Sequence, residues 1–175
     1  NLSALDLENQ IFSCELCPRQ CKVDRHTRSG YCSSPAGIFC ARAALHHWEE
    51  PCISGFAGSG TVFFSGCTLR CVFCQNYEIS QEHFGKSLSS EQLAKVFLNL
   101  QDQGAHNINL VTATQYLPWI LPALRLAKPD LRIPIVYNCG GYERAETILA
   151  LRPYVDIWLP DFKYLDSDLA RRCSG

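Results

Sequence analysis

The spacing of apolar residues changes near residue 60. Residues 1–60 mix Pro, Gly, Ser and charged residues without a regular apolar period, which is typical of loops. Four short runs rich in β-branched and aromatic residues follow, at 61–65, 108–112, 133–137 and 155–159. We therefore expect a loop-dominated N-terminal segment that is followed by four strands.

A helical period lies between the first two of these runs. Apolar residues recur every three or four positions from Leu93 to Leu100, which predicts an amphipathic helix. Ser89 and Gln92 form a capping-box pattern at its start, and Gly104 marks its end.

Two more helices are expected, at residues 116–127 and 143–151. Pro118 and Pro122 predict a kink or a late start in the first of them, because proline lacks a backbone N–H. Strands that alternate with helices favour parallel pairing through right-handed crossovers, since a tight hairpin cannot join parallel neighbours. The chain is therefore predicted to have an α/β fold.

Composition sets limits on size and partners. With 175 residues and 47% hydrophobic content, the chain can bury one ordinary core. We expect a Cys-rich segment at 1–60 and an α/β domain at 61–175. The net charge is -1 and no long basic run is present, which argues against nucleic acid and anionic membranes as partners.

Eleven cysteines are a high and odd count. Their close spacings favour metal ligation over disulfides and therefore a reducing compartment, so we expect a cytoplasmic protein. The sequence contains neither an apolar run long enough to span a bilayer nor a signal-peptide pattern.

Three cysteines follow the first predicted strand, in the run GCTLRCVFCQN. Cys67, Cys71 and Cys74 would place three thiolates in one loop. A four-iron cluster usually takes four thiolates, so three would leave one iron open to bind and activate a ligand. A structural zinc site is the alternative, although zinc prefers four ligands.

The spacing Cys-x3-Cys-x-aromatic-Cys, with Phe73 at the aromatic position, resembles the signature of the radical S-adenosylmethionine (SAM) superfamily. Residues 14–21, 49–52, 75–76 and 159–163 resemble the pyruvate formate-lyase activating enzyme branch of that superfamily. The resemblance implies a partial (β/α) barrel of the radical SAM type. Because only four strands are visible, we expect a fragment of a longer protein, with the barrel truncated after its fourth strand.

The resemblance also implies a function. SAM would bind the open iron of a 4Fe–4S cluster, and one electron would cleave it to methionine and a 5′-deoxyadenosyl radical that abstracts hydrogen from a substrate. Glycyl-radical activating enzymes act in this way on a partner protein. A protein substrate and an electron donor such as flavodoxin or ferredoxin are therefore the implied partners, while the sequence leaves the substrate open.

Residues after the later strands are candidates for binding SAM, since the βα loops of such a barrel meet at one mouth. The Gly-Gly-Glu motif with which the family holds the SAM amino group is replaced here by VTATQ. Thr112 and Thr114 could still accept an ammonium hydrogen bond, or could cap a helix. Asn138 follows the third strand. Asp161 and Lys163 match an Asp-x-Lys element of the activating enzymes, with a solvated ion pair as the alternative.

A second group of four cysteines has the number and spacing of another metal site; its members are Cys14, Cys17, Cys21 and Cys32. A structural zinc and an auxiliary iron–sulfur cluster both fit this group, and four unligated thiols are the remaining alternative. Cys40 and Cys52, with His46 and His47 between them, could donate ligands instead.

Two other functions compete with a radical SAM enzyme. In an iron–sulfur electron-transfer protein every iron would carry a thiolate and no substrate pocket would be needed. A zinc-stabilised binding module would contain zinc and no iron. Added SAM separates the electron-transfer protein from the enzyme, because only an open iron would respond to it.

Overall fold

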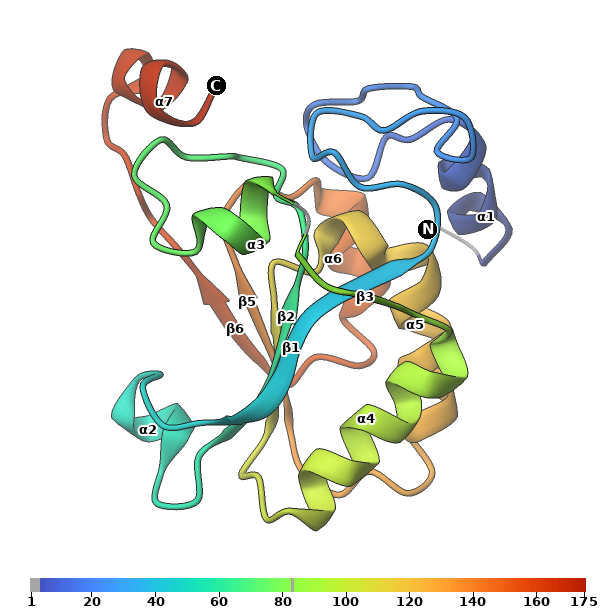
Figure 1. Ribbon diagram of the computed structural model, residues 1–175, viewed down its shortest axis with the longest axis vertical. Coiled ribbons are helices and arrows are strands. Elements are labelled where there is room, and N and C mark those ends of the chain that lie inside the picture. The colour runs from blue at the N-terminus through green and yellow to red at the C-terminus, as the bar shows by residue number, and fades with distance from the viewer. Residues whose placement is uncertain (1–3, 83) are drawn as a thin grey trace.

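The computed structural model describes residues 4–82 and 84–175. A six-stranded sheet forms its centre, with the strand order β3-β1-β2-β4-β5-β6 (Figure 1). The strands are β1 (Ile38–His46), β2 (Ser59–Phe64), β3 (Lys86–Leu88), β4 (Ile108–Val111), β5 (Ile135–Cys139) and β6 (Ile157–Pro160). The helices are α1 (Ala4–Phe12), α2 (Pro51–Ser54), α3 (Tyr77–Gln81), α4 (Ser90–Asp102), the short 3-10 helix η1 (Thr114–Tyr116), α5 (Leu117–Ala127), α6 (Ala145–Leu151) and α7 (Ser167–Ser174). Among the described residues, no helix has both the length and the apolarity needed to cross a membrane.

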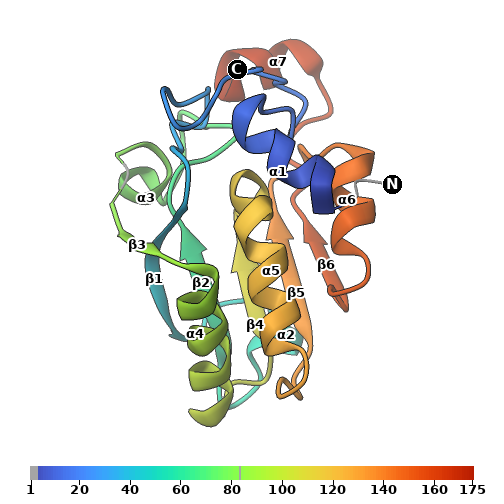
Figure 2. The same cartoon turned by 90° about the vertical axis from the view of Figure 1, so that its right-hand side faces the viewer.

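The four strands predicted after residue 60 are present as β2, β4, β5 and β6, and they pair in parallel. Helices α4 and α5 lie side by side over one face of this sheet (Figure 2). The α/β prediction is therefore confirmed. In the described part of the chain the sheet is open, with β3 and β6 at its edges, so the barrel and its truncation stay predictions.

The prediction of a loop-dominated N-terminal segment is wrong for residues 38–46, which form the long strand β1. This strand pairs antiparallel with both β2 and β3, and a β-bulge interrupts the register between Cys40 and Arg42. Ala and Arg residues give β1 little intrinsic β propensity, so its conformation depends on pairing with its neighbours. The N-terminal segment thus shares one sheet with the residues that follow position 60.

The ends of two helices follow their sequence signals. The Gln92 N–H donates to Ser89 Oγ at 3.2 Å, and the Ser89 N–H donates to Gln92 Oε1 at 2.8 Å, which completes the predicted capping box of α4. Gly104, just beyond α4, has a φ of 90°. Helix α5 begins at Leu117, one residue later than predicted, and carries Pro118 in its first turn, where proline costs no helical hydrogen bond.

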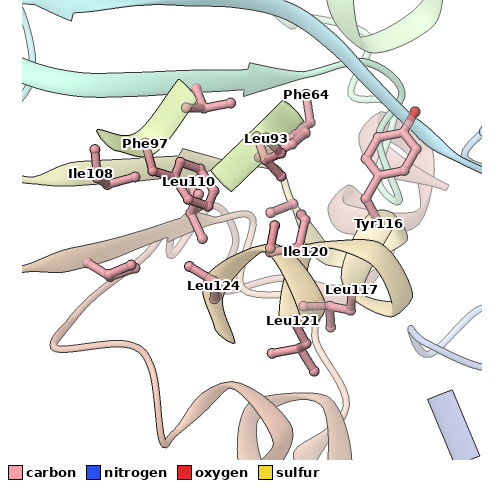
Figure 3. Close-up of a cluster of buried hydrophobic side chains, with 14 of the residues drawn as sticks. Phe64, Leu93, Phe97, Ile108, Leu110, Tyr116, Leu117, Ile120, Leu121 and Leu124 are labelled. Atoms are coloured by element: carbon pink, nitrogen blue, oxygen red, sulfur yellow. The ribbon is translucent and has the colours of Figure 1, made fainter. Parts of the chain in front are cut away.

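The hydrophobic core fills the space between the sheet and helices α4 and α5 (Figure 3). Phe64 of β2, Leu110 of β4, Leu93 and Phe97 of α4 and Leu124 of α5 are among its most deeply buried side chains. Truncating one such leucine to alanine typically costs about 2–5 kcal/mol of stability. This core fixes the strand ends from which the candidate site loops leave.

Candidate functional site

The metal loop, which we define as residues 67–74, leaves the C-terminal end of β2. The Val72 N–H donates to the Cys173 carbonyl oxygen of α7 at 2.9 Å. From α3, Gln81 Nε2 donates to the Cys71 carbonyl oxygen at 3.3 Å. Helices on two sides therefore hold the loop that carries the three predicted cluster ligands.

Each of the three thiols in the metal loop accepts a hydrogen bond. The donors are the Leu69 N–H for Cys67 (3.4 Å), Ser174 Oγ for Cys71 (2.9 Å) and Ser80 Oγ for Cys74 (3.4 Å). Hydrogen bonds of this kind favour the thiolate, which is the form that binds metal. Burial raises the pKa of Cys67, against the lowering effect of the backbone N–H groups of Arg70 and Leu69.

Asp161 and Lys163 form an ion pair just after β6, with Lys163 Nζ 2.5 Å from Asp161 Oδ2. Burial lowers the pKa of Lys163, but the hydrogen bond and charge of Asp161 together with the charges of Cys71 and Cys67 raise it, and the raising effects prevail. The structure thus brings the Lys163 ammonium into the electrostatic neighbourhood of two thiols of the metal loop.

Thr112 and Thr114 lie at the end of β4, where the family motif is replaced. Thr112 has a φ of 56°, in the left-handed region that β-branched residues rarely occupy, and its N–H donates to the Asn138 carbonyl oxygen at 3.0 Å. Thr114 is buried, and its Oγ1 lies 2.7 Å from Tyr137 Oη and donates to Glu143 Oε1 at 2.9 Å. The Thr114 hydroxyl is therefore already hydrogen-bonded within the protein.

Sequence reasoning missed Glu143. Its carboxylate accepts a hydrogen bond from the Thr114 hydroxyl, and burial raises its pKa. Among the ion pairs of the described residues, none involves Glu143. The available signal was its position shortly after the third parallel strand, where the side chains of a site collect.

Asn138 lies against another carboxylate. Its Nδ2 is 3.3 Å from Glu49 Oε2, and burial raises the pKa of Glu49. Glu49 begins the segment 49–52 that resembles the activating enzymes. The contact places this segment beside β5, next to Asn138, which is one of the candidate SAM-binding residues.

Two glycines bring the loop after β5 close to its neighbours. A Cβ atom on Gly140 would lie 2.6 Å from Leu69 Cδ1, in the metal loop. A Cβ atom on Gly141, which has a φ of 71°, would lie 2.5 Å from the Asp161 carbonyl oxygen. Glycine at both positions therefore allows the loops after β2, β5 and β6 to pack together.

The second cysteine group surrounds one cavity, which is also lined by Thr68 of the metal loop. The cysteines that line it are Cys14, Cys17, Cys21 and Cys32. Cys40 is instead buried in β1, Cys52 is exposed in α2, and neither lines the cavity. His46 and His47 are also absent from its lining, so the alternative ligand set gains no support.

The spacing of the metal loop and the parallel α/β sheet define a family. The model of the radical SAM superfamily matches residues 61–175, so the chain belongs to this superfamily of enzymes, which implies a 4Fe–4S cluster and SAM as cofactors. The chain is similar to an uncharacterized protein of Methanocaldococcus jannaschii, with 32% identity over 179 residues that cover 97% of the chain and 51% of that protein.

The chain is also similar to the pyruvate formate-lyase-activating enzyme of Clostridium pasteurianum. The identity is 30% over 113 residues, which cover 61% of the chain and 46% of that enzyme. The predicted relationship to the activating enzymes is therefore confirmed. The chain spans about half the length of these two relatives.

Proposed function

We propose that Cys67, Cys71 and Cys74 hold a 4Fe–4S cluster whose fourth iron binds SAM. The observation that carries this proposal is one loop with three thiols, each of which accepts a hydrogen bond. A cluster fits this donor set better than a structural zinc site, because zinc takes four protein ligands whereas the loop supplies three, which leaves one iron of a cluster for SAM.

When bound, the cluster and SAM supply a 5′-deoxyadenosyl radical that abstracts hydrogen from a substrate. The protein's own residues bind, orient and balance charge. Lys163, held by Asp161, places a positive charge near Cys67 and Cys71, and a nearby cation favours the thiolate over the thiol. Asp161 is more than half exposed, which leaves it accessible to SAM.

The carboxylate of Glu143 is the group best suited to accept the ammonium of SAM. The Thr114 hydroxyl is a neutral group that is already hydrogen-bonded, whereas Glu143 is partly buried and its carboxylate keeps free acceptor positions. In this arrangement Thr114 orients Glu143. Thr112, just after β4, and Asn138, near the end of β5, then offer further polar groups to SAM.

The partners follow from the same chemistry. Reduction of the cluster needs a one-electron donor such as flavodoxin or ferredoxin, and the similarity to an activating enzyme supports a protein with a radical-accepting glycine as the substrate. Reduced thiols are maintained in the cytoplasm, which we propose as the compartment.

Formation of 5′-deoxyadenosine tests this function. The protein is reconstituted anaerobically with iron and sulfide, reduced with dithionite and mixed with SAM. We expect 5′-deoxyadenosine and methionine in equal amounts from the unaltered protein and from Cys52→Ala, a variant at an exposed cysteine of α2, outside the metal loop. Cys71→Ala should form neither product. A reconstituted protein that carries iron but leaves SAM intact would contradict the proposal and favour an electron-transfer protein.

A further inference from the structure

The four cysteines that surround the N-terminal cavity belong to what we call the cysteine segment, residues 13–37. This segment contains turns and bends but no helix or strand. A segment of this size without regular structure rarely holds one conformation unless a metal or a neighbouring surface orders it. Its four cysteines nevertheless line a common cavity.

Backbone amides are directed at the sulfur atoms of this segment. Burial raises the pKa of Cys14 and of Cys17, and the backbone N–H groups of Leu16 and Arg19 act in the opposite direction, toward the thiolates. The Tyr31 N–H donates to Cys21 Sγ at 3.4 Å. In the metal loop, the Leu69 N–H likewise donates to the sulfur atom of Cys67, two residues before it. Such bonds stabilise thiolates, which metal-free thiols do not require.

The backbone of the cysteine segment is also bent to bring these thiols inward. Gln20, Lys22 and Ser33 have φ values of 42°, 50° and 56°, a region that costs energy for residues other than glycine. A Cβ atom on Gly30 would lie 3.1 Å from Cys21 Sγ, so glycine lets the chain pass close to that sulfur.

We propose that Cys14, Cys17, Cys21 and Cys32 bind a second 4Fe–4S cluster, with one thiolate on each iron. A single zinc ion would need all four sulfur atoms about 2.3 Å from one point. A cluster instead takes each thiolate at a separate corner, which suits four cysteines that line one cavity. The inference stands apart from the proposed function, because it concerns a fully ligated cluster at other cysteines.

The second cluster would lie beside the metal loop. Arg19 Nε donates to the Thr68 carbonyl oxygen at 3.1 Å, and its Nη2 donates to the Ser174 carbonyl oxygen at 2.7 Å. Tyr31 Oη donates to the Leu69 carbonyl oxygen at 3.4 Å. Figure 2 shows the N-terminal loops and α7 at the same end of the molecule. Two guanidinium groups, of Arg19 and Arg25, are part of the cavity lining and can offset the negative charge of four thiolates.

Counts of iron and acid-labile sulfide in matched cysteine variants test the proposal. We expect about eight of each per chain in the anaerobically reconstituted protein and in Cys52→Ser, and about four in both Cys17→Ser and Cys71→Ser. Circular dichroism checks the fold of each variant, and Cys32→Ser repeats the test at a second ligand. Retention of about four irons in Cys17→Ser shows that the rest of the protein is intact.

Other outcomes would overturn the inference. Loss of one zinc but no iron in Cys17→Ser would make the site a structural zinc site. Unchanged iron and sulfide in both Cys17→Ser and Cys32→Ser would show four unligated thiols. Failure of the proposed function would look different. Cys17→Ser would then keep the expected count of about four irons, but its remaining cluster would not respond to SAM. Conversely, the cluster left in Cys71→Ser should not respond to SAM, since all of its irons carry thiolates.

Discussion

The metal loop and the cysteine segment present thiols at the same end of the molecule, but different forces hold them there. The metal loop leaves the buried strand β2 and is fastened by α3 and α7. The cysteine segment is fastened by polar side chains that donate to carbonyl oxygens: Arg25 joins it to Gln115, Arg19 to Thr68 and Ser174, and Arg144 and Thr147 donate to its own residues Glu15 and Leu16. A sheet would therefore position the proposed open cluster, whereas the proposed second site would depend on polar contacts and on its own cluster.

The largest expected effect separates the chemical roles of the two cysteine groups. Cys71→Ser should lower the rate of SAM cleavage by more than about 1,000-fold, because the group that carries the chemistry is lost. Cys17→Ser should lower it by less than about tenfold, since the metal loop keeps its contacts with α3 and α7. The rate of 5′-deoxyadenosine formation, corrected for iron content, measures both, with Cys52→Ser as the control. Equal losses in the two variants would contradict the division of roles.

Arg25→Ala tests how the cysteine segment is held. The buried guanidinium donates to three carbonyl oxygens, and its removal leaves them without their donor, which we expect to cost about 3 kcal/mol. Urea unfolding gives the change in the free energy of unfolding. The matched control is Arg28→Ala, because Arg28 is exposed and belongs to the same segment. A loss in Arg25→Ala no greater than in Arg28→Ala would show that these hydrogen bonds do not hold the segment.

Glu143→Gln tests the assignment of the SAM ammonium. Loss of one charged hydrogen-bond acceptor should weaken SAM binding about tenfold, which corresponds to about 1.4 kcal/mol. Equilibrium dialysis with the reconstituted protein measures the Kd, and Glu146→Gln is the control because Glu146 is exposed and pairs with Arg144. An unchanged Kd in Glu143→Gln would exclude Glu143 as the acceptor of the SAM ammonium and would leave Thr112 and Thr114 as the candidates.

The same residue predicts a pH dependence. Burial raises the pKa of Glu143, and only its ionised form attracts an ammonium. SAM affinity should therefore be full above the raised pKa and fall as the pH drops through it, at a higher pH than for an ordinary glutamate. In Glu143→Gln this part of the pH profile should be flat. A profile that is the same in both proteins would exclude Glu143 as its source.

The smallest expected effect comes from α7. Ser174→Ala removes the hydrogen bond to Cys71 Sγ. This loss should destabilise the reduced, more negative form of the cluster by about 1 kcal/mol relative to the oxidised form. The iron count should not change, but the reduction potential should become more negative. Redox titration followed by EPR measures this shift, and Ser167→Ala at the other end of α7 is the control. Equal reduction potentials in the two variants would show that α7 packs against the metal loop without affecting the reduction potential of the cluster.

Local signals in the sequence explain which parts of the fold and site were predictable. The run TVFFS and the Ser89 capping pattern act within a few residues, so β2 and α4 were predicted correctly. The three cysteines of the metal loop lie within eight residues of one another, so their spacing alone suggested a cluster. Strand β1 was not predicted, because its Ala and Arg residues have little intrinsic preference for a strand. Its conformation depends on pairing with β2 and β3.

Contacts between distant residues explain the remaining misses. Glu143 gains its role only when the sheet brings Thr114 within hydrogen-bond distance, and no local pattern marks that pairing. Thr68 likewise joins the N-terminal cavity only through the fold. Thr114 has the expected position, but its hydroxyl is hydrogen-bonded to Tyr137 and Glu143, which short sequence motifs do not reveal.

EPR of the reduced Cys17→Ser variant, recorded with and without SAM, tests the open iron most directly, because only the cluster of the metal loop should remain. The account predicts that SAM changes the spectrum of this cluster and that S-adenosylhomocysteine, which also carries the amino and carboxylate groups, changes it as well. A reduced 4Fe–4S signal that neither compound alters would contradict the central claim, since it would mean that no iron is free to bind a ligand.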